Sequence, residues 1–357
     1  MPLDVIDHRA DPDAWARSLG VSREAVDLLL DADFIDLHLD LEVPVRVIGY
    51  DPTRRHRTPK RPPPLWGHTD LPRIIEAGLT GVVYDIATNP ARPPKNRQAT
   101  TLRNIARIRE RAARHPDQLA VVTNASEYDA ARSAGRLALW ISLQGGNAIV
   151  HDPSVLDGEI GRVLHRITLV HLTSSRLGGT SSPAGPDGGL GLAGKDMIER
   201  CNAARVFIDL AHAGKKTFWE ALGVHARDVP PIVSHTGVDG VRKHWRNLDD
   251  DQIRAIVDRG GVIGIMYQSN FLDRTLLYAR RARIVDHLEH VIAVAGEDAA
   301  AIGTDYDGAI VPPGDLPCVT HHPKLVQDML DRGWSETRIR KILGQNYLRV
   351  VRQMRPS

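Results

Sequence analysis

Cysteine and surplus charge are both scarce in this sequence. Its 357 residues include only two cysteines, Cys201 and Cys318, and no CxxC motif, which excludes a disulfide framework and a thiolate zinc site. The 46 lysines and arginines nearly balance the 44 aspartates and glutamates, so the formal net charge is only +2. We therefore expect no nucleic-acid partner, because proteins that bind nucleic acids usually carry a strong excess of positive charge. The scarcity of cysteine fits a reducing compartment.

Long hydrophobic runs are also absent. No stretch approaches the roughly 18 consecutive apolar residues that a membrane-spanning helix needs. The first residues, MPLDVID, lack the basic and apolar regions of a secretory signal. Hydrophobic residues make up 42% of the chain and charged residues 25%, which is ordinary for a globular protein. These features predict a cytoplasmic protein without a membrane partner.

The sequence does contain a repeated alternation of short apolar runs and helix-length segments. Residues 12–31 predict one or two short helices, with Ser22 as an N-cap. Nine apolar runs follow, at residues 34–41, 81–86, 119–122, 137–143, 167–172, 206–210, 231–234, 261–266 and 300–303. Helix-length segments such as 159–164, 195–204 and 250–257 separate most of them, which is typical of repeated βα units.

Eight of the nine runs would close a barrel. We exclude residues 119–122, because the short helix expected at 126–134 leads at once into the stronger run at 137–143. The sequence therefore predicts an α/β protein with a single (β/α)8 TIM-like barrel at residues 32–357, preceded by a short helical extension at residues 1–31. The proline-rich basic stretch at residues 54–64 is expected to be a loop, either solvated or closing over a site as a lid.

Polar residues recur at the C-terminal ends of the predicted strands. His38 and Asp40 are two residues apart, so on a strand both side chains point to one side and can share a zinc ion. The ends of later strands carry Asp209, His212, His235, Asp305 and Asp307. Taken singly, each of these has a plain explanation as a solvated strand end or a satisfied core histidine. Because barrel sites are built from several strand ends at the C-terminal face, their coincidence predicts a metal site.

The segment His38-Leu39-Asp40 resembles the His-x-Asp motif on the first strand of the membrane (renal) dipeptidases. These are zinc dipeptidases of the amidohydrolase-like barrel group. The resemblance covers most of the chain beyond its first thirty or so residues. Further similar motifs are DLPR at 70–73, ITLVH at 167–171, VFIDLAH at 206–212, PIVSH at 231–235, RNL at 246–248 and GTDYDG at 303–308.

The resemblance implies a role for each of several residues. Those it implies as metal ligands are His38, Asp40, His212 and His235, with the two later histidines at a second zinc ion. Asp305 would be the general acid/base, Arg246 would hold the substrate carboxylate through paired hydrogen bonds, and His171 would contact the substrate. Arg246 also has a simpler explanation as a surface salt bridge, and His171 as a structural residue.

One motif departs from the family. Where the family has Glu-Gly-Gly-His, with the glutamate bridging both zinc ions, this chain has Gln144-Gly145-Gly146-Asn147. A neutral amide is a weaker ligand than a carboxylate and does not supply the anion that holds two dications together. Three outcomes stay open: Gln144 still ligates and the chemistry survives, the site holds one metal and catalyses an altered reaction, or the barrel binds a carboxylate ligand without hydrolysing it.

The expected function is that of a metal-dependent hydrolase of the dipeptidase type. It would use one or two zinc ions to cleave a dipeptide, or a similar small amide, with a free carboxylate. We expect a small-molecule substrate and leave a homodimer open.

Overall fold

The computed structural model describes residues 2–57, 65–89, 92–183, 185–275 and 277–357. Residues 58–64, which make up much of the expected proline-rich loop, lie outside the described residues, and so does any lid role for them.

Parallel strands form the barrel that the sequence predicts. The barrel strands, in their order around the sheet, are β1 (Ile35–Leu39), β2 (Gly81–Ala87), β4 (Leu137–Gln144), β5 (Leu164–Thr168), β6 (Phe207–Asp209), β7 (Ile232–Thr236), β8 (Val262–Ile265) and β9 (Ala300–Ile302). Leu39, at the end of β1, forms a parallel bridge with Tyr306, in the segment that follows β9. β3 (Leu119–Val121) pairs only with β4, outside this ring, so its exclusion from the barrel is confirmed.

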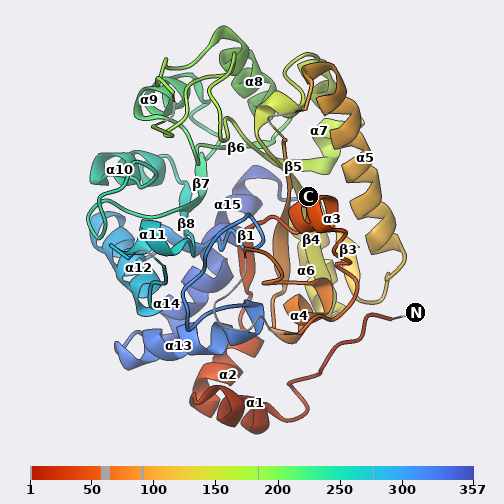
Figure 1. Ribbon diagram of the computed structural model, residues 1–357, viewed down its shortest axis with the longest axis vertical. Helices are drawn as coiled ribbons and strands as arrows, with labels where there is room; N and C mark the ends of the chain where they lie inside the picture. The colour runs from red at the N-terminus through yellow and green to blue at the C-terminus, as the bar shows by residue number, and fades with distance from the viewer. Residues whose placement is uncertain (1, 58–64, 90–91, 184, 276) are drawn as a thin grey trace.

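Helices surround the strands on the outside, and β1 lies near the centre of the view in Figure 1. The α-helices are α1 (Pro12–Leu19), α2 (Arg23–Asp31), α3 (Glu42–Ile48), α4 (Leu71–Glu76), α5 (Pro94–Ala113), α6 (Ala125–Ser133), α7 (Glu159–Val163), α8 (Leu192–Ala203), α9 (Lys215–Val224), α10 (Asp250–Val257), α11 (Ser269–Leu272), α12 (Ala282–Ala295), α13 (His322–Asp331), α14 (Glu336–Arg340) and α15 (Asn346–Met354). Short 3-10 turns occur at η1 (Gly146–Ala148), η2 (Pro153–Asp157) and η3 (Val319–His321), and a π-helical turn, η4 (Lys341–Gln345), joins the last two helices.

Local sequence signals account for the first elements. Ser22 caps α2 as predicted, because its Oγ accepts a hydrogen bond from the Ala25 amide at 3.1 Å. Every residue of β4 is buried, as expected for a parallel strand that is covered on both faces. The two helices α1 and α2 precede β1, while the boundary at residue 31 between an extension and the barrel stays a prediction.

The prediction for β5 was displaced along the chain. The apolar run suggested residues 167–172, but the strand begins at Leu164 and ends at Thr168. Its first half contains two polar residues with buried partners: His165 Nε2 lies 2.7 Å from the Tyr347 hydroxyl, and Arg166 pairs with carboxylates inside the barrel. These partners allow polar side chains to be buried at the start of the strand. Since the strand ends at Thr168, His171 lies in the segment after it.

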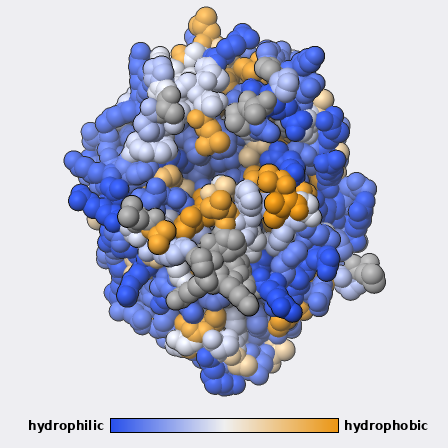
Figure 2. Space-filling view, in the orientation of Figure 1, coloured by the Kyte–Doolittle hydropathy of each residue, from blue (hydrophilic) through white to orange (hydrophobic). Residues whose placement is uncertain are grey.

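The face seen in Figure 2 is largely hydrophilic, with hydrophobic side chains in separate small groups across its middle. Among the described residues, no helix combines the length and the apolar character required to cross a membrane.

Candidate active site

The ends of six barrel strands bring all eight predicted site residues to one region. His38 and His235 lie on strands, Gln144 ends β4, and the others follow strand ends in the loops. Buried members of the set are His38, Asp40, Gln144, His235, Arg246 and Asp305. His171 and His212 are partly exposed.

Two carboxylates lie close to the His38 imidazole. His38 Nε2 is 3.5 Å from Asp40 Oδ2 and 3.6 Å from Asp305 Oδ1, too far for strong hydrogen bonds. These three side chains offer ligand atoms that all lie within 4.8 Å of one another. Such a set of one imidazole and two carboxylates could hold a metal ion.

His212 and His235 form a second cluster beside it. Their Nε2 atoms are 2.9 Å apart, and the ring centroids of His235 and His38 are 3.7 Å apart. Burial lowers the pKa of both His212 and His235 well below the ordinary value, so both rings are neutral. Neutral imidazole is the form that binds metals.

Gln144 lies against this second cluster. Its Nε2 is 3.5 Å from His212 Nε2, and its buried Oε1 has no hydrogen-bond partner. The predicted departure from the family motif therefore falls inside the site. Asp40 and Asp305 stand next to His38, whereas the amide beside His212 brings no negative charge.

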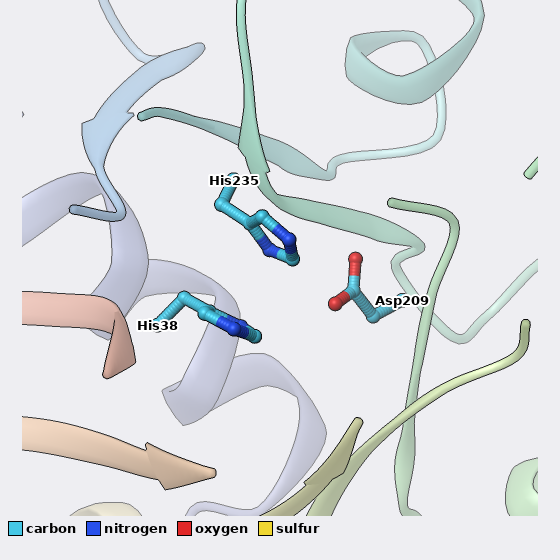
Figure 3. Close-up of side chains that lie close together, drawn as sticks. All are labelled: His38, Asp209 and His235. Atoms are coloured by element: carbon cyan, nitrogen blue, oxygen red, sulfur yellow. The ribbon is translucent and has the colours of Figure 1, made fainter. Parts of the chain in front are cut away.

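Asp209 also faces the site, but hydrogen bonds within the protein already engage both oxygens of its carboxylate. Figure 3 shows His38, Asp209 and His235 directed toward a common space, and the three offer ligand atoms within 4.8 Å. However, Asp209 Oδ1 accepts hydrogen bonds from the amides of Ala211 and Ser234 at 2.9 and 3.0 Å. Its Oδ2 accepts from the hydroxyls of Thr168 and Ser234 at 2.8 and 2.6 Å. Since both oxygens are engaged, Asp209 fits a supporting position better than that of a ligand.

Two buried charged residues behind the site were missed by the sequence analysis. Asp85, on β2, places Oδ2 3.0 Å from His38 Nδ1, and Arg166, on β5, pairs with that carboxylate. Both residues are fully buried. The sequence does contain one sign of them: each is a charged residue within or beside an apolar run. A charge buried in a strand requires a partner, which points to an ion pair inside the barrel.

The pKa shifts follow from burial and from these neighbours. Burial disfavours a charged imidazole at His38, but Asp85 and Asp40 outweigh it and raise the pKa of His38 to about 10. Burial raises the pKa of Asp305 to about 8; His38 lowers it and Asp40 raises it further. Burial opposes ionisation of Asp85 too, but Arg166 and His38 lower its pKa to about 2. Protons and a metal cation would therefore compete for His38 and Asp305.

Arg246 and His171 flank the histidine cluster. Arg246 donates from Nη2 to the His235 carbonyl oxygen at 2.7 Å, while its buried Nε has no partner. Arg246 and His212 both line a cavity of about 360 Å³. The His171 ring packs edge-on against His212 at 4.7 Å between centroids, and burial lowers the pKa of His171 to about 3. The simpler alternative for Arg246, a surface salt bridge, does not hold, because the residue is buried and lines the same cavity as His212.

Two site residues have a backbone that side chains rarely adopt. His212 has φ 65° and Asp305 has φ 59°, both in the left-handed region. Such conformations cost on the order of 1–3 kcal/mol each and persist where the surroundings impose them. The Asp305 amide donates to the His38 carbonyl at 3.0 Å, and the Ser181 amide donates to the His212 carbonyl at 2.8 Å. These bonds fix the angles at which the two side chains enter the site.

The donor set fits a metal ion. His38 Nε2, Asp40 Oδ1 and Gln144 Oε1 are buried atoms without hydrogen-bond partners, which a cation would satisfy. Space for the carboxylates is kept by Gly308, since a Cβ there would lie 2.9 Å from Asp40 Oδ2 and would collide with Asp305 Oδ1. The His and Asp donors suit zinc.

A family profile and a curated relative both match most of the chain. The profile of the membrane dipeptidase family (peptidase family M19) matches residues 22–356. The chain is 28% identical over 339 residues to Dipeptidase verJ of Clonostachys rogersoniana, covering 92% of this chain and 86% of that protein.

Solved structures share the fold. A metallo peptidase from Rhodobacter sphaeroides, liganded with a phosphinate mimic of the dipeptide L-Ala-D-Ala, has a TM-score of 0.78 at 24% identity and covers 90% of this chain and 99% of its own. The probable dipeptidase PvdM from Pseudomonas aeruginosa has a TM-score of 0.81 at 18% identity and covers 95% and 98%. Since the family profile spans nearly the whole sequence, the chain belongs to the membrane dipeptidase family and is a metal-dependent dipeptide hydrolase.

Proposed function

We propose that this chain cleaves dipeptides at the barrel mouth with zinc held by His38, Asp40, His212 and His235. One observation carries the proposal: buried, unpaired or neutral donor atoms from several strand ends converge on a single region. Zinc binds imidazole nitrogen and carboxylate oxygen readily, and this site offers both.

Each group at the site has its own role in the reaction. A zinc ion bound there would act as a Lewis acid that polarises the peptide carbonyl and activates water. Asp305 takes a proton from the attacking water and returns it to the leaving amine, which suits a carboxyl group whose pKa burial raises to about 8. His171, neutral and beside His212, contacts the substrate.

Arg246 recognises the free carboxylate of the dipeptide. Burial lowers the pKa of Arg246 to about 10, so it stays charged at neutral pH, and its unpaired Nε is available for a substrate. A guanidinium can grip a carboxylate through two parallel hydrogen bonds. This favours substrates with a free C-terminal acid over amidated ones.

Because Gln144 is neutral, the two metal positions differ in the negative charge that their ligands supply. The donors beside it, His212 and His235, are neutral, whereas Asp40 and Asp305, once deprotonated, contribute negative charge next to His38. We therefore infer that a second zinc ion binds more weakly than the first. A single ion could instead be held by His38, Asp40, His212 and Asp305, with His235 acting on the water.

Metal content tests the assignment. His212→Ala and His235→Ala should each lower bound zinc, measured by elemental analysis after dialysis, together with dipeptide hydrolysis. His290→Ala serves as the control, because His290 lies on the outer helix α12 and pairs with Asp250 at 2.7 Å. Unchanged zinc in both site variants would contradict the assignment.

A cytoplasmic location and a homodimer belong to the proposal as well. The location rests on the two free, buried cysteines. Fractionation of the native cells and light scattering of the purified protein test the two points separately.

A further inference from the structure

Arg166 lies inside the barrel, between the residues that orient His38 and those that orient His235. It is fully buried on β5. Its Nη2 pairs with Asp85 Oδ2 and lies 2.9 Å from His38 Nδ1. Its Nε donates to Ser142 Oγ at 3.0 Å and lies 3.6 Å from Asp209 Oδ2, so Asp209 is held by charge attraction and not by a hydrogen bond. One guanidinium thus reaches two carboxylates that lie behind different metal-site residues.

The contacts of Arg166 form a network with two arms. The first arm, through Asp85, fixes the orientation of the His38 ring. Its Nδ1 is 3.0 Å from Asp85 Oδ2. In the neutral form of His38, Nδ1–H donates to that carboxylate and Nε2 keeps a lone pair that faces Asp40 and Asp305. Arg166 Nη2, which can only donate, then pairs with Asp85 and not with Nδ1. Arg166 holds Asp85 in place for this bond, and it also donates to the Leu37 carbonyl beside His38.

The second arm fixes His235. The Ser234 hydroxyl gives its only proton to Asp209 Oδ2 at 2.6 Å. His235 Nδ1, 2.8 Å from the same hydroxyl oxygen, must therefore be the donor in that contact. This leaves the lone pair on His235 Nε2, which faces His212 Nε2 at 2.9 Å. Arg166 Nε stands beside the Asp209 carboxylate that orients Ser234.

We propose that Arg166 is a positioning residue that couples the orientation of His38 to that of His235, so that the two clusters bind metal as one unit. This inference rests on the proposed metal site. Arg166 does not touch the substrate or the reacting atoms; it acts through Asp85 on one side and through Asp209 and Ser234 on the other. Groups that orient metal-binding histidines in this way typically change metal affinity ten- to hundredfold when they are replaced.

Zinc affinity of the full-length protein, stripped of metal and titrated in competition with a chromophoric chelator, tests the coupling. Arg166→Lys keeps the buried charge but presents one ammonium group in place of a two-edged guanidinium. We expect it to lower zinc affinity by about ten- to hundredfold. Asp85→Asn and Ser234→Ala should each lower it by breaking a single arm. In the Arg166→Lys background each arm change should cost less than in the wild type, because the link is already loosened.

Arg355→Lys is the matched control, since Arg355 donates to the backbone carbonyls of Gly161 and Ala204 at 2.9 and 3.0 Å, away from the site. It should lower the melting temperature without changing zinc affinity. Wild-type affinity in folded Arg166→Lys would overturn the inference, as would equal arm costs in both backgrounds.

A second measurement decides the matter if Arg166→Lys does not fold. The double variant Asp85→Asn with Ser234→Ala leaves Arg166 in place. Coupled arms predict a combined loss that differs from the product of the single losses, and independent arms predict that product. His38→Ala and His235→Ala are measured alongside. If neither loses zinc, the proposed metal site itself is wrong; if both lose zinc while the arms prove independent, only the coupling is wrong.

Discussion

Gln144 Nε2 lies 3.5 Å from His212 Nε2, so a neutral amide stands where the family's motif has a glutamate. The amide oxygen on the same side chain is buried and without a partner. This places the departure from the family motif against the histidines that would bind the second ion, and it makes the charge at this position the first thing to test.

Gln144→Glu should raise bound zinc toward two ions per chain and raise dipeptide hydrolysis with it. The added carboxylate supplies an anion between the two clusters, which two dications need when they lie about 3.5 to 4 Å apart. Elemental analysis and turnover of a dipeptide panel measure both effects. Gln118→Glu is the control, because it makes the same change at a side chain outside the site, whose Oε1 accepts a hydrogen bond from the Leu3 amide. Two tightly held ions in the wild type, with hydrolysis unchanged by Gln144→Glu, would show that the amide already serves and that the ordinary two-metal chemistry applies.

Arg246→Ala should weaken the binding of acids far more than that of their amidated analogues, by about 1.5 to 3 kcal/mol for a charged hydrogen bond. Because Arg246 also donates to the His235 carbonyl at 2.7 Å, its loss can disturb the metal site, but that disturbance affects both ligands alike. Arg246→Lys keeps the charge without the paired geometry and should give an intermediate difference. Inhibition constants of matched acids and amides provide the measurement; equal losses for both would assign Arg246 another role.

Asp305→Asn should lower kcat by about a hundred- to ten-thousandfold, the usual contribution of a general acid/base. The amide keeps the size of the side chain but can no longer take up the proton. Zinc content is measured on the same sample, since Asp305 Oδ1 lies 3.6 Å from His38 Nε2 and would border a metal ion bound there. A variant that retains zinc and wild-type kcat would remove Asp305 from the chemistry.

Zinc affinity should rise with pH between about 7 and 10. Protons on Asp305, with a pKa of about 8, and on His38, with a pKa of about 10, compete with the ion in the metal-free protein. Raising the pH removes these protons, so the sign of the effect is toward tighter binding. Calorimetry in two buffers of different ionisation enthalpy measures the protons released. No proton release at pH 7 would show that these groups are already deprotonated.

Much of the fold could be predicted because parallel barrel strands are buried on both faces and leave continuous apolar runs. The run at 137–143 became β4, and the weaker run at 119–122 became β3 outside the ring. β5 was misplaced because His165 and Arg166 look unlike core residues in the sequence. Their partners, Tyr347 and Asp85, are distant in the chain and meet them only in the fold.

The site residues were predicted from strand-end polar positions and from motifs, and the structure brings them together. The layer behind them was not. Asp85 lies within the apolar run at 81–86, and nothing in the local sequence links it to His38, whose Nδ1 is 3.0 Å from Asp85 Oδ2 in the fold. The left-handed backbone of His212 also has no local signature, since it depends on neighbours such as Ser181.

The most direct test of the metal site is an anomalous-diffraction map of wild-type crystals grown with zinc, recorded on both sides of the zinc absorption edge. We expect a strong peak in contact with His38 and Asp40, and a weaker one beside His212 and His235. A map without a zinc peak at these residues, or with zinc bound only by other side chains, would contradict this expectation.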